Sequence, residues 1–378
     1  MNRRTRNPAT PARAAAPAAA GLAGIRVRID AIDAELQALI NERARLAQTV
    51  GSAKREAGTT AEFYRPEREA EVLRGVLARN RGPLTDEEMV RLFREIMSAC
   101  LAQQEPLKIA FLGPEGTFTQ QAVLKHFGHS VRALPLSGID EVFREVESGA
   151  ADFGVVPIEN STEGAVSHTA DMFLVSPLKI CGEVELRIHQ HLIGRLESLD
   201  RIERICSHQQ SLAQCRLWLE EHLPHVERIP VSSNAEAARR ARDEHGTAAI
   251  AGAAAAEVYG LEVLVPEIED RPDNSTRFLV VGRKILEPSG RDRTTLLISG
   301  PDTGGPGALV RLLEPFARHA INMSRLESRP SRRKKWDYVF FLDLDGHASD
   351  PPMAKALAEA KKRASLFKLL GSYPRAVL

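Results

Sequence analysis

Apolar residues near the start of the chain recur at spacings of three and four residues, which predicts one long amphipathic helix over residues 24–57. The apolar positions are Ile25, Ile29, Ile32, Leu36, Leu39, Ile40, Leu46, Ala47 and Val50. A helix of about 33 residues would be roughly 50 Å long, which is longer than a small domain is wide. We therefore expect the helix to form part of an intertwined dimer.

Two cations, Arg43 and Lys54, fall on the same apolar stripe. A cation on a buried face is costly unless an anion meets it, so the pattern predicts a partly buried site for a negatively charged ligand. The two residues are about three helical turns apart and share one side of the helix. Arg26 lies roughly 100° around the axis, so we expect it to reach the equivalent site of a second copy. The alternative is that each cation extends to solvent at the edge of the stripe.

Two shorter helices are predicted to follow. The first begins within residues 64–69 and carries Glu69, and the second begins at Thr85, which is predicted to form a capping box with Glu88. Gln104 lies near the end of the second of these helices. Glu69 and Gln104 are the polar residues that we expect to join the cationic site.

Short apolar segments then alternate with helical patterns, which predicts an α/β domain with ligand-binding loops at the strand ends. Its length is sufficient for two lobes with a cleft between them. The predicted strands cover residues 109–112, 153–156, 202–206, 248–250 and 278–281. Linkers are predicted at 102–107 and 287–290.

Polar clusters lie at the ends of these strands. Residues 113–118 join a strand to a helix, so their backbone amides and the Thr117 hydroxyl are candidates to hold an anion, although such a turn is often only a geometric necessity. The other clusters are 157–162, which contains Asn160 and Ser161; 208–215, which contains His208 and Gln214; and 274–278, which contains Thr276, Arg277 and Phe278.

The last hundred residues or so follow a βαββαβ order, which is typical of a ferredoxin-like α+β domain. Strands are predicted at 294–299, 321–328, 338–344 and 367–370, and helices from 307 and over 351–364.

Composition narrows the function classes. The chain has 378 residues, 43% of them hydrophobic, and a net charge of +1, which argues against a nucleic-acid-binding surface. The basic run 332–335 is predicted to be a solvated loop, and residues 1–21, rich in Arg, Pro and Ala, are predicted to be disordered. Four cysteines without paired spacing indicate reduced thiols in a cytoplasm, and no segment is long enough to cross a membrane. His189 and His191 lack a third ligand, so no metal is expected.

The helical segment with Arg43, Lys54 and Gln104 resembles the all-helical chorismate mutase family, in which an intertwined dimer rearranges chorismate to prephenate. The resemblance implies that Arg43 and Arg26 of the second copy bind the carboxylates. It also implies that Lys54 and Gln104 face the ether oxygen and that Glu69 takes the ring hydroxyl. Further substrate-side positions are Arg68 and Cys100, the latter at a position where the family can have serine.

Residues 107 to about 283 resemble prephenate dehydratase, and the triplet Thr276-Arg277-Phe278 is the most specific mark. The resemblance implies that Thr276 donates a hydrogen bond to the departing hydroxyl. No cofactor is expected, because aromatisation of the ring drives the reaction. The candidate substrate-binding residues are Thr117, Asn160, Ser161, His208, Gln214, Arg277 and Phe278.

The C-terminal pattern resembles the ACT regulatory domain, in which two motifs hold phenylalanine at a subunit interface. The motifs here are Gly307-Ala308-Leu309 and Glu327-Ser328-Arg329-Pro330. Val310 stands where relatives often have histidine. The alternative is an ACT-like domain that binds no effector.

The three resemblances together imply a cytoplasmic bifunctional enzyme of phenylalanine synthesis that forms phenylpyruvate and is inhibited by phenylalanine. The expected domains are 22–105, 107–286 and 293–375, in a homodimer or higher homo-oligomer without nucleic-acid or membrane partners. Two alternatives remain: arogenate as the substrate of the dehydratase, and an inactive amino-acid-sensing protein.

Overall fold

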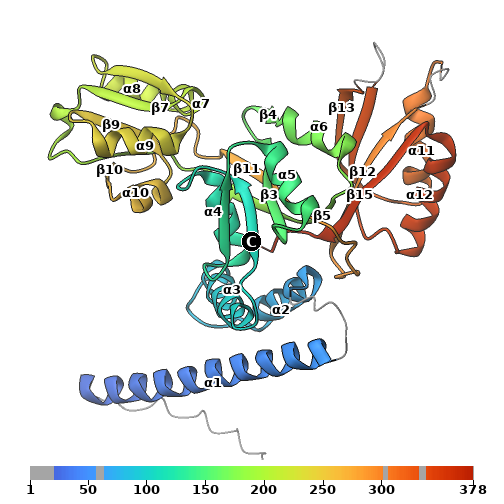
Figure 1. The fold of residues 1–378 in the computed structure, drawn as a ribbon, viewed down its shortest axis with the longest axis horizontal. Helices are drawn as coiled ribbons and strands as arrows, with labels where there is room; N and C mark the ends of the chain where they lie inside the picture. Colours follow the sequence, from blue (N-terminus) through green and yellow to red (C-terminus); the bar gives the residue numbers. More distant parts are fainter. Residues whose placement is uncertain (1–20, 57–63, 301–304, 332–337, 378) are drawn as a thin grey trace, which may run out of the picture.

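The computed structural model describes residues 21–56, 64–300, 305–331 and 338–377, with only the backbone of residues 54–56. The predicted tail at 1–21 falls outside this part of the chain except for Gly21, as do the basic run 332–335 and the side chain of Lys54. The described chain forms helices at its N-terminal end, two α/β lobes and a C-terminal α+β domain (Figure 1).

The long N-terminal helix is confirmed as α1 (Leu22–Glu56). It is followed by α2 (Pro66–Arg79) and α3 (Asp86–Ala102). The predicted capping box is present, since Thr85 accepts from the backbone of Glu88 and the Glu88 side chain accepts from the backbone of Thr85. Helices α2 and α3 lie between α1 and the rest of the molecule (Figure 1). As a result, the large apolar side chains of α1 remain exposed, from 40% at Ile40 to 68% at Val27.

The first lobe is built on a mixed sheet with the strand order β2-β1-β3-β11-β5. Strands β1, β2 and β3 are parallel, whereas β11 runs antiparallel to both neighbours. The short β4 (Gly164–Ala165) pairs with β3. The main strands are β1 (Lys108–Leu112), β2 (Arg132–Leu136), β3 (Phe153–Asn160), β5 (Lys179–Arg187) and β11 (Ser275–Gly282), and the helices are α4 (Phe118–Phe127), α5 (Ile139–Ser148) and α6 (Ser167–Val175).

The second lobe is inserted between β5 and β11 and has the strand order β10-β6-β9-β7-β8. Two chain segments, 188–190 and 266–274, therefore connect the lobes. The strands are β6 (His191–Gly194), β7 (Arg204–His208), β8 (Glu227–Val231), β9 (Thr247–Ala251) and β10 (Glu262–Val265). The helices are α7 (Gln209–Gln214), α8 (Arg216–His222), α9 (Asn234–Asp243) and α10 (Ala253–Tyr259), with a 3-10 turn at Leu199–Arg201.

The C-terminal domain has the predicted βαββαβ order and an antiparallel sheet, β13-β14-β12-β15. Its edge strand β13 pairs with β14 on one side only. The elements are β12 (Asp292–Ser299), α11 (Ala308–Arg318), β13 (Met323–Pro330), β14 (Tyr338–Asp345), α12 (Pro351–Arg363) and β15 (Leu366–Pro374).

The C-terminal sheet and the first lobe share one hydrophobic core. Leu297, Phe341 and Tyr373 belong to the same buried cluster as Val142 and Phe173 of the first lobe. The approach is close: a Cβ atom on Gly371 would lie 2.3 Å from the backbone oxygen of Ile180. The first lobe and the C-terminal domain are therefore packed as one unit.

The predicted linker at 287–290 is held in place by the helical domain. Arg74 of α2 donates to the backbone oxygen of Ser289 at 2.6 Å and to its hydroxyl at 3.0 Å. Ser289 also bonds Asp292, and it is 8% exposed. This linker is consequently a structured contact between the helical domain and the C-terminal domain.

Candidate active site and regulatory contacts

A cleft of about 330 Å³ lies between the two lobes and gathers most of the predicted dehydratase residues. Thr276, the second residue of β11, lies directly opposite Asn160, the last residue of β3. His208 and Gln214 reach the cleft from the two ends of α7 in the second lobe, and Thr117 reaches it from the start of α4. Five residues from four sequence clusters thus meet in one place.

Hydrogen bonds connect the amide and hydroxyl groups of this cleft. Asn160 Nδ2 donates to Thr276 Oγ1 at 2.8 Å and to Asn274 Oδ1 at 3.0 Å. Asn274 Nδ2 donates to Gln214 Oε1 at 3.1 Å, which links the first lobe to the second. Because Thr276 accepts from Asn160, its own proton is available to another acceptor.

The cleft is lined by uncharged groups apart from one histidine. The described residues that line the cleft include no Lys, Arg, Asp or Glu. His208 is the one ionisable side chain among them. Hydroxyl and amide groups supply the polar surface, and Leu112, Phe118 and Ile188 supply apolar surface. A ligand in this cleft is therefore held by neutral hydrogen-bond donors.

Thr117 and His208 line the cleft but also cap helices. The Thr117 hydroxyl donates to Leu112 O at 3.3 Å and accepts from Gln120 N at 3.4 Å, which occupies the hydroxyl proton. The backbone amide of Gly116 is bonded to the Gln120 side chain at 2.6 Å. His208 Nδ1 accepts from Gln210 N at 3.3 Å. The predicted anion cradle at 113–118 is therefore already partly satisfied by the protein.

Three predicted substrate contacts do not lie in the cleft. Successive side chains of a strand point to opposite faces, so Arg277 points away from the face that carries Thr276. Phe278, which is 2% exposed, packs in the core with Phe111 and Val155. Ser161 lies on the exposed turn after β3, where its hydroxyl accepts from Ser275 N at 3.0 Å. These three residues build the sheet and its interfaces and are not among the residues that line the cleft.

Arg277 is instead the centre of the contact between the first lobe and the C-terminal domain. Its guanidinium lies 2.8 Å from Glu183 Oε2 and 2.6 Å from Asp343 Oδ2, and it donates to the hydroxyl of Tyr373 at 3.0 Å. Arg293 adds a second cation beside Glu183. The prediction that Arg277 anchors a substrate carboxylate is therefore wrong for this geometry, because two protein carboxylates already occupy its donors.

The cleft also contains four residues that were not predicted contacts, although two of them, Asn274 and Ser211, lie within the polar clusters 274–278 and 208–215. Asn274, Gln190, Ser211 and Asn234 all line the cleft, and the first three are at most 4% exposed. Asn274 lies two positions before Thr276, so its neighbourhood was a usable signal. Gln190 and Asn234 come from distant segments and meet the site only through the fold.

In the helical domain, one predicted site residue, Gln104 just after α3, contacts α1. Gln104 Nε2 donates to Ala47 O of α1 at 2.8 Å. Arg43 is half-buried on α1, and Arg26 is exposed nearer the start of that helix. Cys100 is 3% exposed, whereas Arg68 is exposed and pairs with Glu71 at 2.8 Å. Within one protomer, Gln104 and α1 therefore come together, and Arg68 faces solvent.

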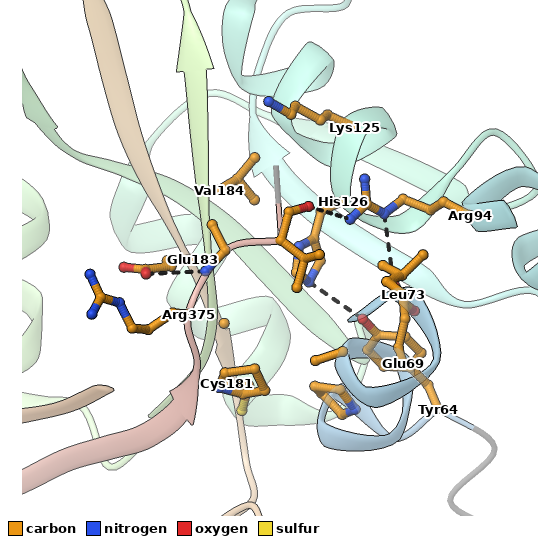
Figure 2. A pocket seen from close by; sticks show the side chains of 16 residues that line it. Tyr64, Glu69, Leu73, Arg94, Lys125, His126, Cys181, Glu183, Val184 and Arg375 are labelled. Carbon is orange, nitrogen blue, oxygen red and sulfur yellow. Dashed lines mark hydrogen bonds and ion pairs between the residues drawn. The ribbon is translucent and has the colours of Figure 1, made fainter. Parts of the chain in front are cut away.

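Glu69 lies elsewhere, in a small cavity between helices α2 and α3 and the first lobe (Figure 2). Arg94 of α3 is 3.6 Å from its carboxylate, and Tyr64 and His126 face each other beside it. Burial raises the pKa of Glu69 to about 7, and burial together with the charge of Arg94 lowers the pKa of His126 to about 3. The residues around this cavity include none from the described part of α1. The predicted meeting of Glu69 with Gln104 does not occur in this protomer, because α2 turns Glu69 toward the first lobe.

The two predicted effector motifs lie on α11 and β13. Gly307 precedes α11 with φ of 76°, a conformation that favours glycine, and Ala308 and Leu309 begin the helix. Glu327, Ser328, Arg329 and Pro330 form the end of edge strand β13. From this strand Arg329 reaches Asp171 of α6 at 3.4 Å and Arg325 reaches Glu159 of β3 at 2.7 Å. The second motif is thus in direct ionic contact with the first lobe.

Among the described residues, no group of three or more His, Cys, Asp or Glu is arranged to hold a metal ion. His189 pairs with Glu269 at 2.8 Å. All four cysteines are buried and free. Within the part of the chain that the structure describes, no helix combines the length and apolarity needed to cross a membrane.

Family models identify the class of each part of the chain. Residues 25–105 match chorismate mutase type II, residues 109–285 match prephenate dehydratase, and residues 294–361 match the ACT domain. A solved structure of prephenate dehydratase from Arthrobacter aurescens in complex with L-Phe is similar, with a TM-score of 0.66, 38% identity and coverage of 71% of this chain and 90% of that one. A structure described as a novel type of quorum quenching acylase, GqqA, has a TM-score of 0.65 and 30% identity over 71% of this chain and 98% of its own.

Full-length relatives identify the family. The bifunctional chorismate mutase/prephenate dehydratase of Stutzerimonas stutzeri is 56% identical over 361 residues, which is 94% of this chain and 98% of that protein. This chain belongs to the bifunctional chorismate mutase/prephenate dehydratase family. It therefore carries both enzymatic domains and an ACT domain in one polypeptide.

Proposed function

We propose that this chain converts chorismate to prephenate in its helical domain and prephenate to phenylpyruvate in the cleft between its α/β lobes. Phenylalanine binding to the ACT domain inhibits the second step. The observation that carries the dehydratase assignment is the uncharged cleft around Thr276. The full-length relationship at 56% identity favours this pair of activities over the acylase described for the more distant GqqA.

The cleft suits a reaction that must lose a carboxylate. Prephenate gives up its ring hydroxyl and carbon dioxide together: the bond to the carboxylate breaks, its electrons enter the ring, and the bond to the hydroxyl breaks. A lysine or arginine at the ring carboxylate would stabilise the charge that has to be lost, whereas neutral donors and apolar walls do so less. The departing hydroxyl becomes water once it gains a proton, and a positioned donor assists its departure.

Thr276 is the proposed donor to that hydroxyl. Its oxygen already accepts from Asn160, so its proton is directed to a second acceptor, which in the complex is the leaving oxygen. Gln214 and His208 are proposed to hold the substrate carboxylates, since both line the same cleft, and Asn160 is proposed to orient Thr276. No step requires a cofactor, because formation of the aromatic ring drives the reaction.

For the mutase, Arg43 and Lys54 of one copy, Gln104 of the same copy and Arg26 of the second are the proposed contacts to chorismate. The exposed apolar stripe of α1 supports a homodimer, because such a large uncovered apolar face needs a partner. Cations that hold the dicarboxylate and donors at the ether oxygen suffice for this rearrangement. Four free, buried cysteines suit the cytoplasm, which is where we place the enzyme.

Regulation by phenylalanine is supported by two features of the C-terminal domain. Strand β13 carries the second motif on an open sheet edge, where a second copy could pair. The same strand bonds the first lobe through Arg325 and Arg329. An effector that changes these contacts binds the two states of the dehydratase differently, which is the requirement for inhibition at a distance.

Purified protein supplied with chorismate tests both activities. We expect prephenate to form first and phenylpyruvate to follow, and we expect Thr276→Ala to stop the sequence at prephenate. Supplied arogenate provides the alternative substrate in a parallel arm. If the wild-type chain formed neither product, the amino-acid-sensing alternative would replace this proposal.

Mixed subunits test the dimer. Arg26→Ala and Lys54→Ala proteins should each lack mutase activity, and subunit exchange between them should restore part of it, because one composite site then has both residues. Mixtures that exchange subunits and stay inactive would exclude a shared site.

A further inference from the structure

Asn274 contacts two of the polar residues of the cleft but has no assigned role. It is 2% exposed and lies two residues before Thr276. We propose that Asn274 is a positioning residue for dehydration: it holds the Asn160 amide group in place beside Thr276, which keeps the Thr276 hydroxyl a hydrogen-bond donor, and it orients the Gln214 amide. This inference rests on the function proposed for the cleft.

The orientation of Asn160 is set by the turn that follows β3. Its Oδ1 accepts from Thr162 N at 3.0 Å, from Glu163 N at 3.1 Å and from the Thr162 hydroxyl at 2.6 Å. Backbone N–H groups can only donate, so this side of the amide must be the oxygen. The Nδ2 group must therefore face Thr276 and Asn274.

Asn274 extends this order of hydrogen-bond donors and acceptors to the second lobe. Its Oδ1 accepts from Asn160, so its Nδ2 faces Gln214 Oε1, which also accepts from Gln190 Nε2 at 3.2 Å. The Gln214 Nε2 group is then left to face the Thr162 hydroxyl at 3.4 Å and the cleft. One consistent order of donors and acceptors thus extends from the turn at 162–163 to α7.

The backbone of Asn274 is fixed as well. Its carbonyl accepts from Ile188 N at 2.8 Å, which ties together the two segments that connect the lobes. The side chain therefore has a defined place between the lobes and is not free to turn out of the network.

The chemical consequence falls on Thr276. A hydroxyl has one proton and two lone pairs, and accepting from Asn160 leaves the proton for the substrate. Without Asn274 Oδ1, the Asn160 Nδ2 group loses one of its two acceptors and is held less firmly against Thr276 Oγ1. The Thr276 proton would then be directed less often to the leaving oxygen, and donation would weaken. Asn274 acts through this arrangement and needs no contact with the reacting atoms.

A double-mutant cycle on the full chain tests the proposal, with supplied prephenate as substrate. We expect Asn274→Ala to lower dehydratase kcat at least tenfold and to change KM for prephenate less than about threefold, since a lost hydrogen bond of this kind is worth about one factor of ten. In a Thr276→Ala background the same change should cost less than about twofold, because Asn274 acts through Thr276. Mutase activity of each protein reports whether the chain is folded.

Two further variants keep the result decisive. Asn274→Asp retains the acceptor for Asn160, so its kcat should lie between those of the wild type and Asn274→Ala. Ser275→Ala changes the adjacent residue outside the cleft and should leave kcat unchanged. If Thr276→Ala alone left dehydration intact, the proposed function would fail. If Thr276→Ala lowered it to a residual rate and Asn274→Ala caused the same fold loss in both backgrounds, or Asp were no better than Ala, the positioning role would be wrong.

Discussion

Replacement of Arg277 by methionine is the sharpest test of the interface between the dehydratase lobe and the C-terminal domain. The side chain bonds Glu183, Asp343 and Tyr373, and the two carboxylates are 6% and 3% exposed. Methionine keeps much of the apolar length of the side chain but removes the cation. Two buried carboxylates then lose their shared partner, which is the most costly way to break a buried ion pair.

The magnitude follows from what each carboxylate retains. Breaking a buried pair costs about 3–5 kcal/mol in general. Glu183 keeps Arg293, and Asp343 keeps the hydroxyl of Thr295 at 2.7 Å, so we expect the lower end, about 3 kcal/mol. For a unit of this size that corresponds to a decrease of roughly 6–12 °C in the unfolding midpoint. Tyr373→Phe removes only the hydroxyl and should cost about 1 kcal/mol.

Calorimetry and steady-state kinetics on the same proteins separate two roles for Arg277. A structural role predicts a lower unfolding midpoint, an altered response to phenylalanine and a nearly unchanged KM for prephenate at a temperature where the variant is folded. Arg277→Lys should restore part of the stability. A normal midpoint combined with a tenfold or larger rise in KM would refute the reasoning and return Arg277 to the substrate site.

Three further outcomes are expected. Lys54→Ala should lower chorismate turnover by a hundredfold or more, roughly the value of one preorganised donor, while dehydration of supplied prephenate stays intact; normal turnover would remove Lys54 from the mutase site. Glu69 has a pKa raised from 4.5 to about 7 by burial, so its neutral form stabilises the fold by about 3 kcal/mol below pH 4.5, and this contribution is lost as the pH rises through 7. Glu69→Gln should remove that dependence between pH 4.5 and 7 in thermal unfolding, and an unchanged pH profile would contradict the burial of this carboxyl. Gly307→Val should reduce inhibition by phenylalanine in dehydratase assays, because Gly307 has φ of 76° at the start of α11; full inhibition would place the effector elsewhere. A point variant is preferable to deletion of the domain, whose removal would expose the shared core.

The features that local patterns predicted well are those that local physics determines. The capping box at Thr85 and Glu88, the length of α1 and the βαββαβ order each depend on residues close together in sequence. The position of Thr276 at the start of a strand also followed from its neighbourhood. These predictions needed only periodicity, caps and turn residues.

The features that failed depend on which face or neighbour the tertiary fold selects. Alternation along β11 shows that Thr276 and Arg277 face opposite ways, but only packing shows which faces the cleft. Glu69 lies on an amphipathic helix whose partner is another domain, and no spacing within α2 encodes that contact. Asn274 is buried because two distant connections meet beside it, and its role is visible only with both in place.

The adjacency of Thr276 and Arg277 limits how this chain can change in length. Deleting or inserting one residue just before β11 would shift the strand by one position and exchange its two faces. A deletion would bring the guanidinium of Arg277 into the neutral cleft, whereas an insertion would place Thr276 opposite Glu183 and Asp343 and leave these carboxylates without a countercharge. Insertions and deletions should therefore be tolerated in exposed turns of the second lobe, while the segment from Asn274 through β11 keeps a constant length.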